Sequence, residues 1–103
     1  IHVVDLVIGH VKALQHMKSG TSVYNLGTGN GVSVLQLIKA FEQASGKTVP
    51  YTIVDRRVGD IASCYASADK ASQALDWHTE RTIEQACEDS WRWQSQNPNG
   101  YKV

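Results

Sequence analysis

The chain has 103 residues, and its ten basic side chains are balanced by ten acidic ones. A chain of this length forms one domain or part of one, and it can bury a modest core. Nucleic acids and anionic membranes are poor candidates for partners, because both are bound through clustered Lys and Arg and no run of like charge occurs here. No apolar stretch approaches the length of a membrane span. Composition and charge therefore predict a soluble protein.

The two cysteines, Cys64 and Cys87, lie in different predicted elements and have no metal-ligand spacing. This usage is typical of a reduced cytoplasmic protein rather than of a disulfide scaffold, so we expect a cytoplasmic protein without a metal site. The chain opens without Met on a strand-like run, Ile1-His2-Val3-Val4. We therefore expect it to begin inside a larger protein.

The first predicted element is a helix over residues 5–18, with Asp5 as its N-terminal cap and Gly20 just past its end. Apolar side chains recur after Asp5 at spacings of four and three residues: Val7, Val11, Leu14 and Met17. Gly9, inside the helix, indicates close packing against a neighbour. A helix of this kind normally buries its stripe, so the stripe should be exposed if its covering domain lies outside the chain.

A βαβ unit is predicted next, with strands over residues 22–26 and 49–54 and a helix over residues 33–44. Ser33 and Gln36 have the spacing of a capping box, and Gly46 follows the helix. Its predicted buried stripe consists of Val34, Leu37, Ile38, Phe41 and Ala44. The fold class is therefore α/β, with flanking helices around the βαβ unit.

The glycine loop between the first strand and the helix has two interpretations. Strand, glycines, helix, strand and then Asp55 is also the order of a dinucleotide-binding fingerprint. That fingerprint requires a third glycine where Val32 stands. We therefore favour a plain turn over NAD binding by this loop, although the amides at the helix start could still face an anionic or polar ligand.

The loop Arg56-Arg57-Val58-Gly59-Asp60 is the most informative segment, because it places a planar cation, a flexible glycine and a carboxylate directly after a strand. Arg binds phosphate oxygens two at a time, and Asp accepts hydrogen bonds from hydroxyls or orients the Arg. The loop could therefore hold a phosphorylated sugar. The alternative is a solvated surface ion pair.

The remaining predicted elements are a short extended piece at residues 64–66, a helix that is capped by Asp69 and runs through Leu75, and a last helix that starts at Thr82. Gln85 completes a second capping box there, and the helix should bury Ile83, Ala86, Cys87, Ser90 and Trp91. We interpret the three tryptophans as packing residues rather than as sugar-stacking platforms. No catalytic constellation is recognisable in these residues.

Four segments occur in the order found in the UDP-glucose 4-epimerases, also called UDP-galactose 4-epimerases, of the extended short-chain dehydrogenase/reductase superfamily. They are Ile1-His2-Val3-Val4-Asp5-Leu6, Tyr24-Asn25-Leu26-Gly27-Thr28-Gly29, Arg56-Arg57-Val58-Gly59-Asp60, and Trp91-Arg92-Trp93-Gln94 with Asn97-Pro98-Asn99-Gly100-Tyr101. The first two are shared across the superfamily, whereas the last two are more specific to the epimerases. The whole chain resembles the C-terminal third of these enzymes.

The resemblance implies that residues 1–103 are the C-terminal UDP-sugar-binding portion of an enzyme that interconverts UDP-glucose and UDP-galactose through a 4-keto intermediate. The N-terminal NAD-binding Rossmann domain, with its Tyr base, is absent from this chain, so the chain alone should be inactive. The full-length enzyme is expected to be a homodimer. A related nucleotide-sugar dehydratase or decarboxylase and a non-catalytic nucleotide-binding module remain as alternatives.

The resemblance also assigns roles to four residues of this sequence. Arg57 matches the Arg that binds the UDP diphosphate, Asp60 the acid that binds the uridine ribose, and Val34 an apolar contact near the uridine. Cys64 matches the position beside the sugar C2 substituent, where other members carry Tyr, so UDP-N-acetylhexosamines are expected substrates as well. The alternative for Cys64 is a small buried packing residue.

Overall fold

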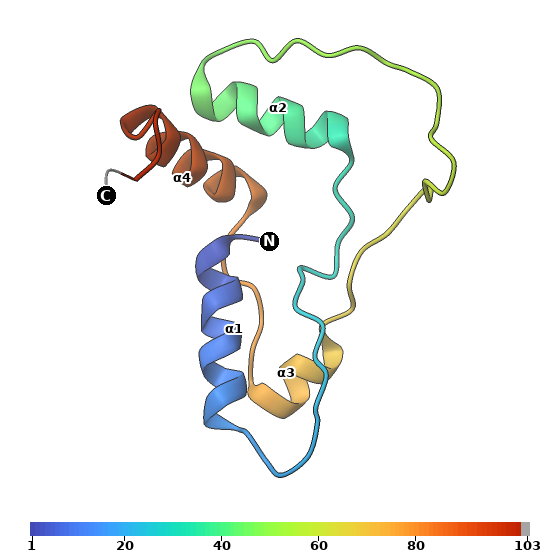
Figure 1. Cartoon of the computed structure of the whole chain (residues 1–103), viewed down its shortest axis with the longest axis vertical. Coiled ribbons are helices and arrows are strands. Elements are labelled where there is room, and N and C mark those ends of the chain that lie inside the picture. Colours follow the sequence, from blue (N-terminus) through green and yellow to red (C-terminus); the bar gives the residue numbers. More distant parts are fainter. Residues whose placement is uncertain (102–103) are drawn as a thin grey trace.

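The computed structural model describes residues 1–101. Within them the chain forms four helices: α1 (Val3–Gln15), α2 (Val34–Ser45), α3 (Asp69–Leu75) and α4 (Ile83–Gln96). Helix α1 lies against α3, and α2 lies against α4 (Figure 1). A long irregular segment arches from the end of α2 back to α3 (Figure 1). None of the helices in residues 1–101 combines the length and the apolar character that a membrane span requires.

The predicted strands are wrong for the part of the chain that the structure describes, and so is the βαβ unit. Residues 22–26, 49–54 and 64–66 are not strands, whereas the helix between the first two segments forms. A parallel strand exists only when a neighbouring strand satisfies its backbone groups. No two segments within residues 1–101 pair in that way, so apolar sequence alone does not produce a sheet here.

The predicted capping signals of α2 and α4 are confirmed. The Ser33 side chain accepts from the Gln36 backbone N–H at 3.1 Å, and the Gln36 side chain accepts from the Ser33 N–H at 2.8 Å. Thr82 and Gln85 form the same reciprocal pair at the start of α4. Gly46 closes α2 in the left-handed conformation, with φ +66°. Each of these signals acts over a single turn of the chain.

The prediction that Asp5 caps α1 is wrong. The helix begins at Val3, and the N-cap is His2, whose Nδ1 accepts from the Val4 N–H at 3.0 Å. Asp5 lies within the first turn and is only 1% exposed. Because the imidazole satisfies the helix end, the carboxylate is available for a contact far away in the sequence.

That contact ties α1 to the segment between α3 and α4. The Asp5 Oδ2 accepts from the backbone N–H groups of Glu80 and Arg81 at 3.1 and 2.9 Å, and its Oδ1 accepts from the Arg81 guanidinium at 2.6 Å. The Asp5 backbone oxygen accepts from Trp77 Nε1 at 2.9 Å. Burial alone raises the pKa of Asp5, but these hydrogen bonds and the Arg81 charge outweigh it, so the pKa lies below its ordinary value.

A small apolar core forms where α1 meets α3. Ala71, Leu75 and Trp77 are almost fully buried, and Gly9 of α1 faces the same cluster. A Cβ at Gly9 would lie 2.6 Å from Leu26 Cδ1 and 3.1 Å from Trp77 Nε1. The close packing predicted for this glycine is therefore confirmed, and the buried Trp77 is a packing residue as predicted.

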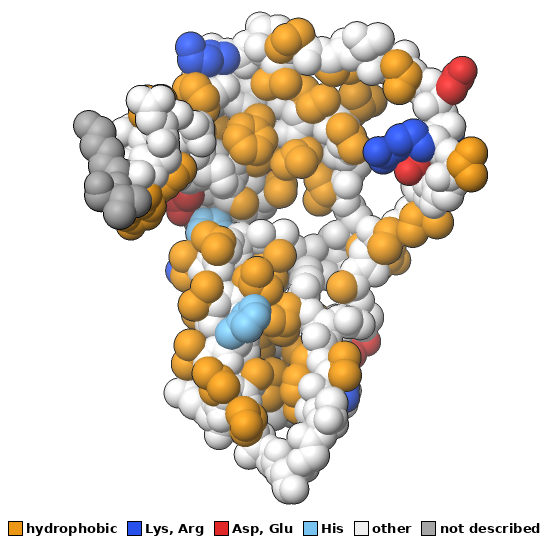
Figure 2. Space-filling view, viewed as in Figure 1, with side chains coloured by type: hydrophobic (Ala, Val, Ile, Leu, Met, Phe, Trp, Pro, Cys, Tyr) orange, Lys and Arg blue, Asp and Glu red, His pale blue; other side chains and the backbone are white. Residues whose placement is uncertain are grey.

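Much apolar surface stays outside this core. The predicted stripe of the first helix is exposed: Val7 53%, Val11 47% and Leu14 68% on α1, and Met17 73% just past its end. Figure 2 shows hydrophobic side chains gathered along α1. On α2 the predicted buried stripe is wrong for Val34 and Leu37, which are exposed, whereas Ile38, Phe41 and Ala44 are half-buried. In the described residues α4 is the one helix that packs on α2, so part of the stripe remains uncovered.

Helix α4 buries the predicted side chains to different degrees. Cys87 is buried, and Ile83, Ala86 and Trp91 are half-buried, but Ser90 is exposed, contrary to prediction. The remaining tryptophan, Trp93, is 45% exposed. Only part of the predicted face is therefore covered by α2.

We expect Asp76→Gly to stabilise the protein. Asp76 closes α3 in the left-handed conformation, with φ +50° and ψ +46°, which strains a residue that carries a Cβ. Removing that strain should raise the free energy of unfolding by about 0.5–1 kcal/mol, measured by urea unfolding. Asp69→Gly, within α3, should instead destabilise. A loss of stability in Asp76→Gly would contradict the strain argument.

The Asp5 contacts predict a pH dependence of stability. Because the pKa of Asp5 is lowered by folding, its contribution is complete above the ordinary carboxyl pKa of about 3.9 and is lost as the pH falls through the lower folded value. Urea unfolding of Asp5→Asn below about pH 4 should therefore show a flatter stability profile than the wild type. The exposed Asp55→Asn serves as the control, and equal slopes for Asp5→Asn and the wild type would refute the assignment.

Candidate functional site

The predicted phosphate-binding loop forms a tight turn. The Asp60 N–H donates to the Arg57 carbonyl at 3.2 Å, and Gly59 has φ +90°, a conformation that favours glycine. The Asp60 Oδ2 in turn accepts from the Arg57 backbone N–H at 3.1 Å and from Arg57 Nε at 3.3 Å. The carboxylate thus orients the guanidinium, one of the two roles predicted for it.

This turn is open to solvent. The Arg57 side chain is 86% exposed, and that of Asp60 is 38% exposed. An ion pair this exposed contributes little to stability. Within the described residues the one hydrogen bond of the guanidinium is made by Nε, so the donors of its two terminal nitrogens point to no protein acceptor.

The other two predicted site residues line one cavity of 340 Å³. Val34 opens α2, and Cys64 belongs to the segment that returns toward α3. A third part of the lining consists of Arg81, Thr82 and Ile83 at the start of α4. The fold therefore brings Val34 and Cys64 together, although they are distant in sequence, and leaves Arg57 and Asp60 outside this lining.

The glycine loop contributes to the same cavity through packing. A Cβ at Gly27 would lie 2.9 Å from Ala66 Cβ and 3.4 Å from the Ala66 carbonyl oxygen. Thr28 Oγ1 donates to the Asn30 carbonyl at 3.0 Å and accepts from the Asn30 N–H at 3.2 Å. These contacts are those of a plain turn. Val32 stands in place of the third glycine, and within residues 1–101 no strand precedes the loop, so the loop lacks the features of the dinucleotide-binding fingerprint.

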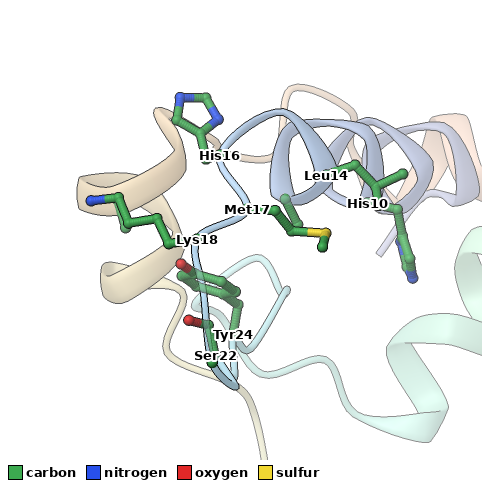
Figure 3. Close-up of a pocket in the computed structure, with 10 residues that line it drawn as sticks. His10, Leu14, His16, Met17, Lys18, Ser22 and Tyr24 are labelled. Carbon is green, nitrogen blue, oxygen red and sulfur yellow. The ribbon is translucent and has the colours of Figure 1, made fainter.

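A larger cavity of 580 Å³ lies at the C-terminal end of α1 and holds none of the predicted site residues (Figure 3). Two histidines of its lining form hydrogen bonds with the backbone of α1. His10 Nδ1 donates to the Leu6 carbonyl and His16 Nδ1 donates to the Lys12 carbonyl, each at 2.8 Å. Among the described residues no group of His, Cys, Asp and Glu is suited to a metal ion.

The two cysteines are free and have different surroundings. Cys64 is exposed at the edge of the 340 Å³ cavity, whereas Cys87 is buried in α4. Burial raises the pKa of the Cys87 thiol, and the nearby charges of Glu84 and Glu88 raise it further. A protonated, buried thiol is a packing group rather than a nucleophile.

Sequence reasoning missed the wall formed by residues 81–83 and the role of Asp5 behind it. The Thr82 capping signal located the start of α4 correctly. Nothing local in the sequence connects Asp5 with Arg81, because the two are 76 positions apart and meet only in the folded chain. A buried charge pair of this kind has no periodicity or motif that could reveal it.

Comparison with known proteins gives one consistent result. No family model matches the chain. It is 61% identical over 105 residues to a UDP-glucose 4-epimerase of Drosophila melanogaster and 59% identical over 104 residues to that of Bacillus subtilis. These alignments cover 98% and 99% of this chain but 30% and 31% of the relatives. The chain thus spans about a third of the length of the curated relatives it matches.

Solved structures agree with the sequence comparison. The fold matches UDP-glucose 4-epimerase from Bifidobacterium longum in complex with NAD⁺ and UDP with a TM-score of 0.89 and 54% identity, over 98% of this chain and 30% of the other. It matches the Stenotrophomonas maltophila enzyme, with bound NAD and formylated UDP-arabinopyranose, with a TM-score of 0.87 and 44% identity, over 95% and 30%. By sequence and by fold, the chain belongs with the C-terminal part of the UDP-glucose 4-epimerases, which have the short-chain dehydrogenase/reductase fold.

Proposed function

We propose that this chain is the UDP-sugar-binding part of an NAD-dependent UDP-glucose 4-epimerase, which interconverts UDP-glucose and UDP-galactose through a 4-keto intermediate. The observation that carries the proposal is the Arg57 turn, in which Asp60 and Gly59 present an exposed guanidinium. Two similar structures, described with UDP and with a formylated UDP-arabinopyranose, support it.

Four residues divide the recognition of the UDP-sugar. Arg57 binds the diphosphate with its free guanidinium donors, and Asp60 binds the hydroxyls of the uridine ribose. Val34 provides an apolar contact for the uridine, and Cys64 lies beside the sugar C2 substituent. Support for the last two assignments comes from the 340 Å³ cavity that Val34 and Cys64 share.

The chain supplies binding rather than catalysis. We found neither a base nor a dinucleotide site in the described residues, so NAD and the hydride chemistry belong to an N-terminal Rossmann domain in this proposal. The exposed stripe of α1 is suited to packing against that domain. The assembled enzyme would be a cytoplasmic homodimer, and the two free cysteines are consistent with a reducing compartment.

In the intact enzyme, Arg57→Ala should weaken UDP binding much more than Arg56→Ala, because the Asp60 carboxylate orients only Arg57. Loss of a charge-assisted contact costs about 1.5–3 kcal/mol, which corresponds to a roughly ten- to hundredfold higher Kd. Titration calorimetry with UDP measures both variants against the wild type. Equal and small effects would return the pair to the solvated-surface interpretation.

Cys64 predicts substrate range. A thiol leaves room for an N-acetyl group, so the intact enzyme should turn over UDP-N-acetylglucosamine as well as UDP-glucose. Cys64→Tyr should reduce turnover of the N-acetylated sugar by roughly a hundredfold or more and spare UDP-glucose, because exclusion acts by steric repulsion. Paired rate measurements on the two sugars test this, with Cys64→Ser as the size-matched control. A wild type that ignores the N-acetylated sugar, or a Tyr variant that slows both sugars equally, would remove Cys64 from the pocket.

A further inference from the structure

One wall of the 340 Å³ cavity is anchored from outside the cavity. Arg81 and Thr82 line it together with Val34 and Cys64. Asp5 does not line it, yet the Asp5 carboxylate holds the backbone N–H groups of Glu80 and Arg81 and the Arg81 guanidinium. The wall therefore depends on a residue of α1 that has no contact with the cavity.

The same residue holds both ends of the connection between α3 and α4. Trp77, at the start of that connection, donates to the Asp5 backbone oxygen, and Arg81, at its end, donates to the Asp5 carboxylate. Thr82 follows immediately and is the N-cap of α4. A shift of this wall would break three hydrogen bonds to one carboxylate at once.

The carboxylate is well suited to hold a segment rigidly. Asp5 is 1% exposed and Arg81 is 33% exposed, so their ion pair is largely shielded from water. Removing one partner from a shielded pair of this kind leaves the other without compensation and is strongly unfavourable. The segment consequently has one favourable position relative to α1.

We propose that Asp5 is a positioning residue for the UDP-sugar cavity: through Arg81 and the backbone of residues 80–81 it sets the cavity wall formed by residues 81–83. The inference rests on the proposed function, since the ligand of the cavity is taken from it. Asp5 does not line the cavity, so its effect is on affinity rather than on the chemical step.

A second contact between α1 and α4 provides the matched control. His2 Nδ1 accepts from the Val4 N–H, so Nε2 carries the hydrogen and donates to Asp89 Oδ2 at 2.9 Å. This hydrogen bond is the main reason that the pKa of Asp89 is lowered; burial opposes it, and the nearby Arg92 lowers the pKa further. Asp89 does not line the 340 Å³ cavity, although His2 does, and Asn at position 89 can still accept from His2; Asp89→Asn therefore removes the charge and keeps the hydrogen bond to the cavity residue.

The test compares Asp5→Asn, Arg81→Gln, the double variant and Asp89→Asn in the intact enzyme. Calorimetry with UDP is done at a temperature at which circular dichroism shows each variant to be folded, and KM and kcat are measured for UDP-glucose. Asp5→Asn should raise the UDP Kd and KM by about tenfold and leave kcat within about twofold, because a displaced wall weakens binding. Asp89→Asn should change neither constant.

Coupling separates positioning from two independent effects. Asp5 and Arg81 act on one wall. The factor by which the double variant raises the UDP Kd should therefore be smaller than the product of the factors for the two single variants. Fully multiplicative losses would overturn the proposal. If Asp5→Asn does not fold, Asp5→Glu takes its place, because it keeps the charge but displaces the carboxylate by one methylene: a several-fold higher UDP Kd with kcat within about twofold is expected, and a wild-type Kd overturns the proposal.

Failure of the inference differs from failure of the proposed function. A lower melting temperature of Asp5→Asn with unchanged UDP Kd would make Asp5 purely structural and leave the proposed function intact. A wild-type enzyme that does not bind UDP would overturn the proposed function and, with it, the assignment of the cavity.

Discussion

The buried Asp5 carboxylate is the interaction on which the arrangement of the helices depends. It lies on the first turn of α1 and binds the segment that leads into α4, while the backbone oxygen of the same residue binds Trp77 beside α3. Three of the four helices are thereby related to one another through a single residue. Charge-assisted hydrogen bonds are directional as well as strong, so such a contact restricts geometry more than an apolar contact of equal area would.

The candidate site has two parts, one formed by local contacts and one formed by segments that are distant in sequence. The Arg57 turn is solvent-exposed and local: a glycine with positive φ and a carboxylate three residues from the Arg are sufficient to form it. The Val34 and Cys64 cavity is non-local, and its shape depends on how α1 places the start of α4. In the proposed function the first part attracts the diphosphate and the second discriminates by volume, so charge and size specificity would vary separately.

The apolar stripe of α1 and the unpaired segments at residues 22–26 and 49–54 have a common physical basis. An amphipathic helix and a parallel strand both require a partner, the helix for its apolar face and the strand for its backbone groups. Within residues 1–101 neither partner is present in full. Local helix formation proceeds without it, because helical hydrogen bonds are made within the segment.

The sequence by itself determined many of the features whose cause lies within one turn of chain, although the His2 cap of α1 and the left-handed Asp76 were missed. The capping boxes of Ser33 with Gln36 and Thr82 with Gln85, the left-handed Gly46 and Gly59, and the Arg57–Asp60 pair all follow from neighbours three residues apart or fewer. The resemblance to the epimerases was likewise readable from the residues alone. Tertiary structure decided whether the apolar segments pair as strands, which parts of the helix stripes are covered, and what Asp5 does. Asp5 looks like a helix cap to any local rule, and only folding brings Arg81 within 2.6 Å of it. Contacts of that sequence separation depend on the packing of whole elements, which no local pattern encodes.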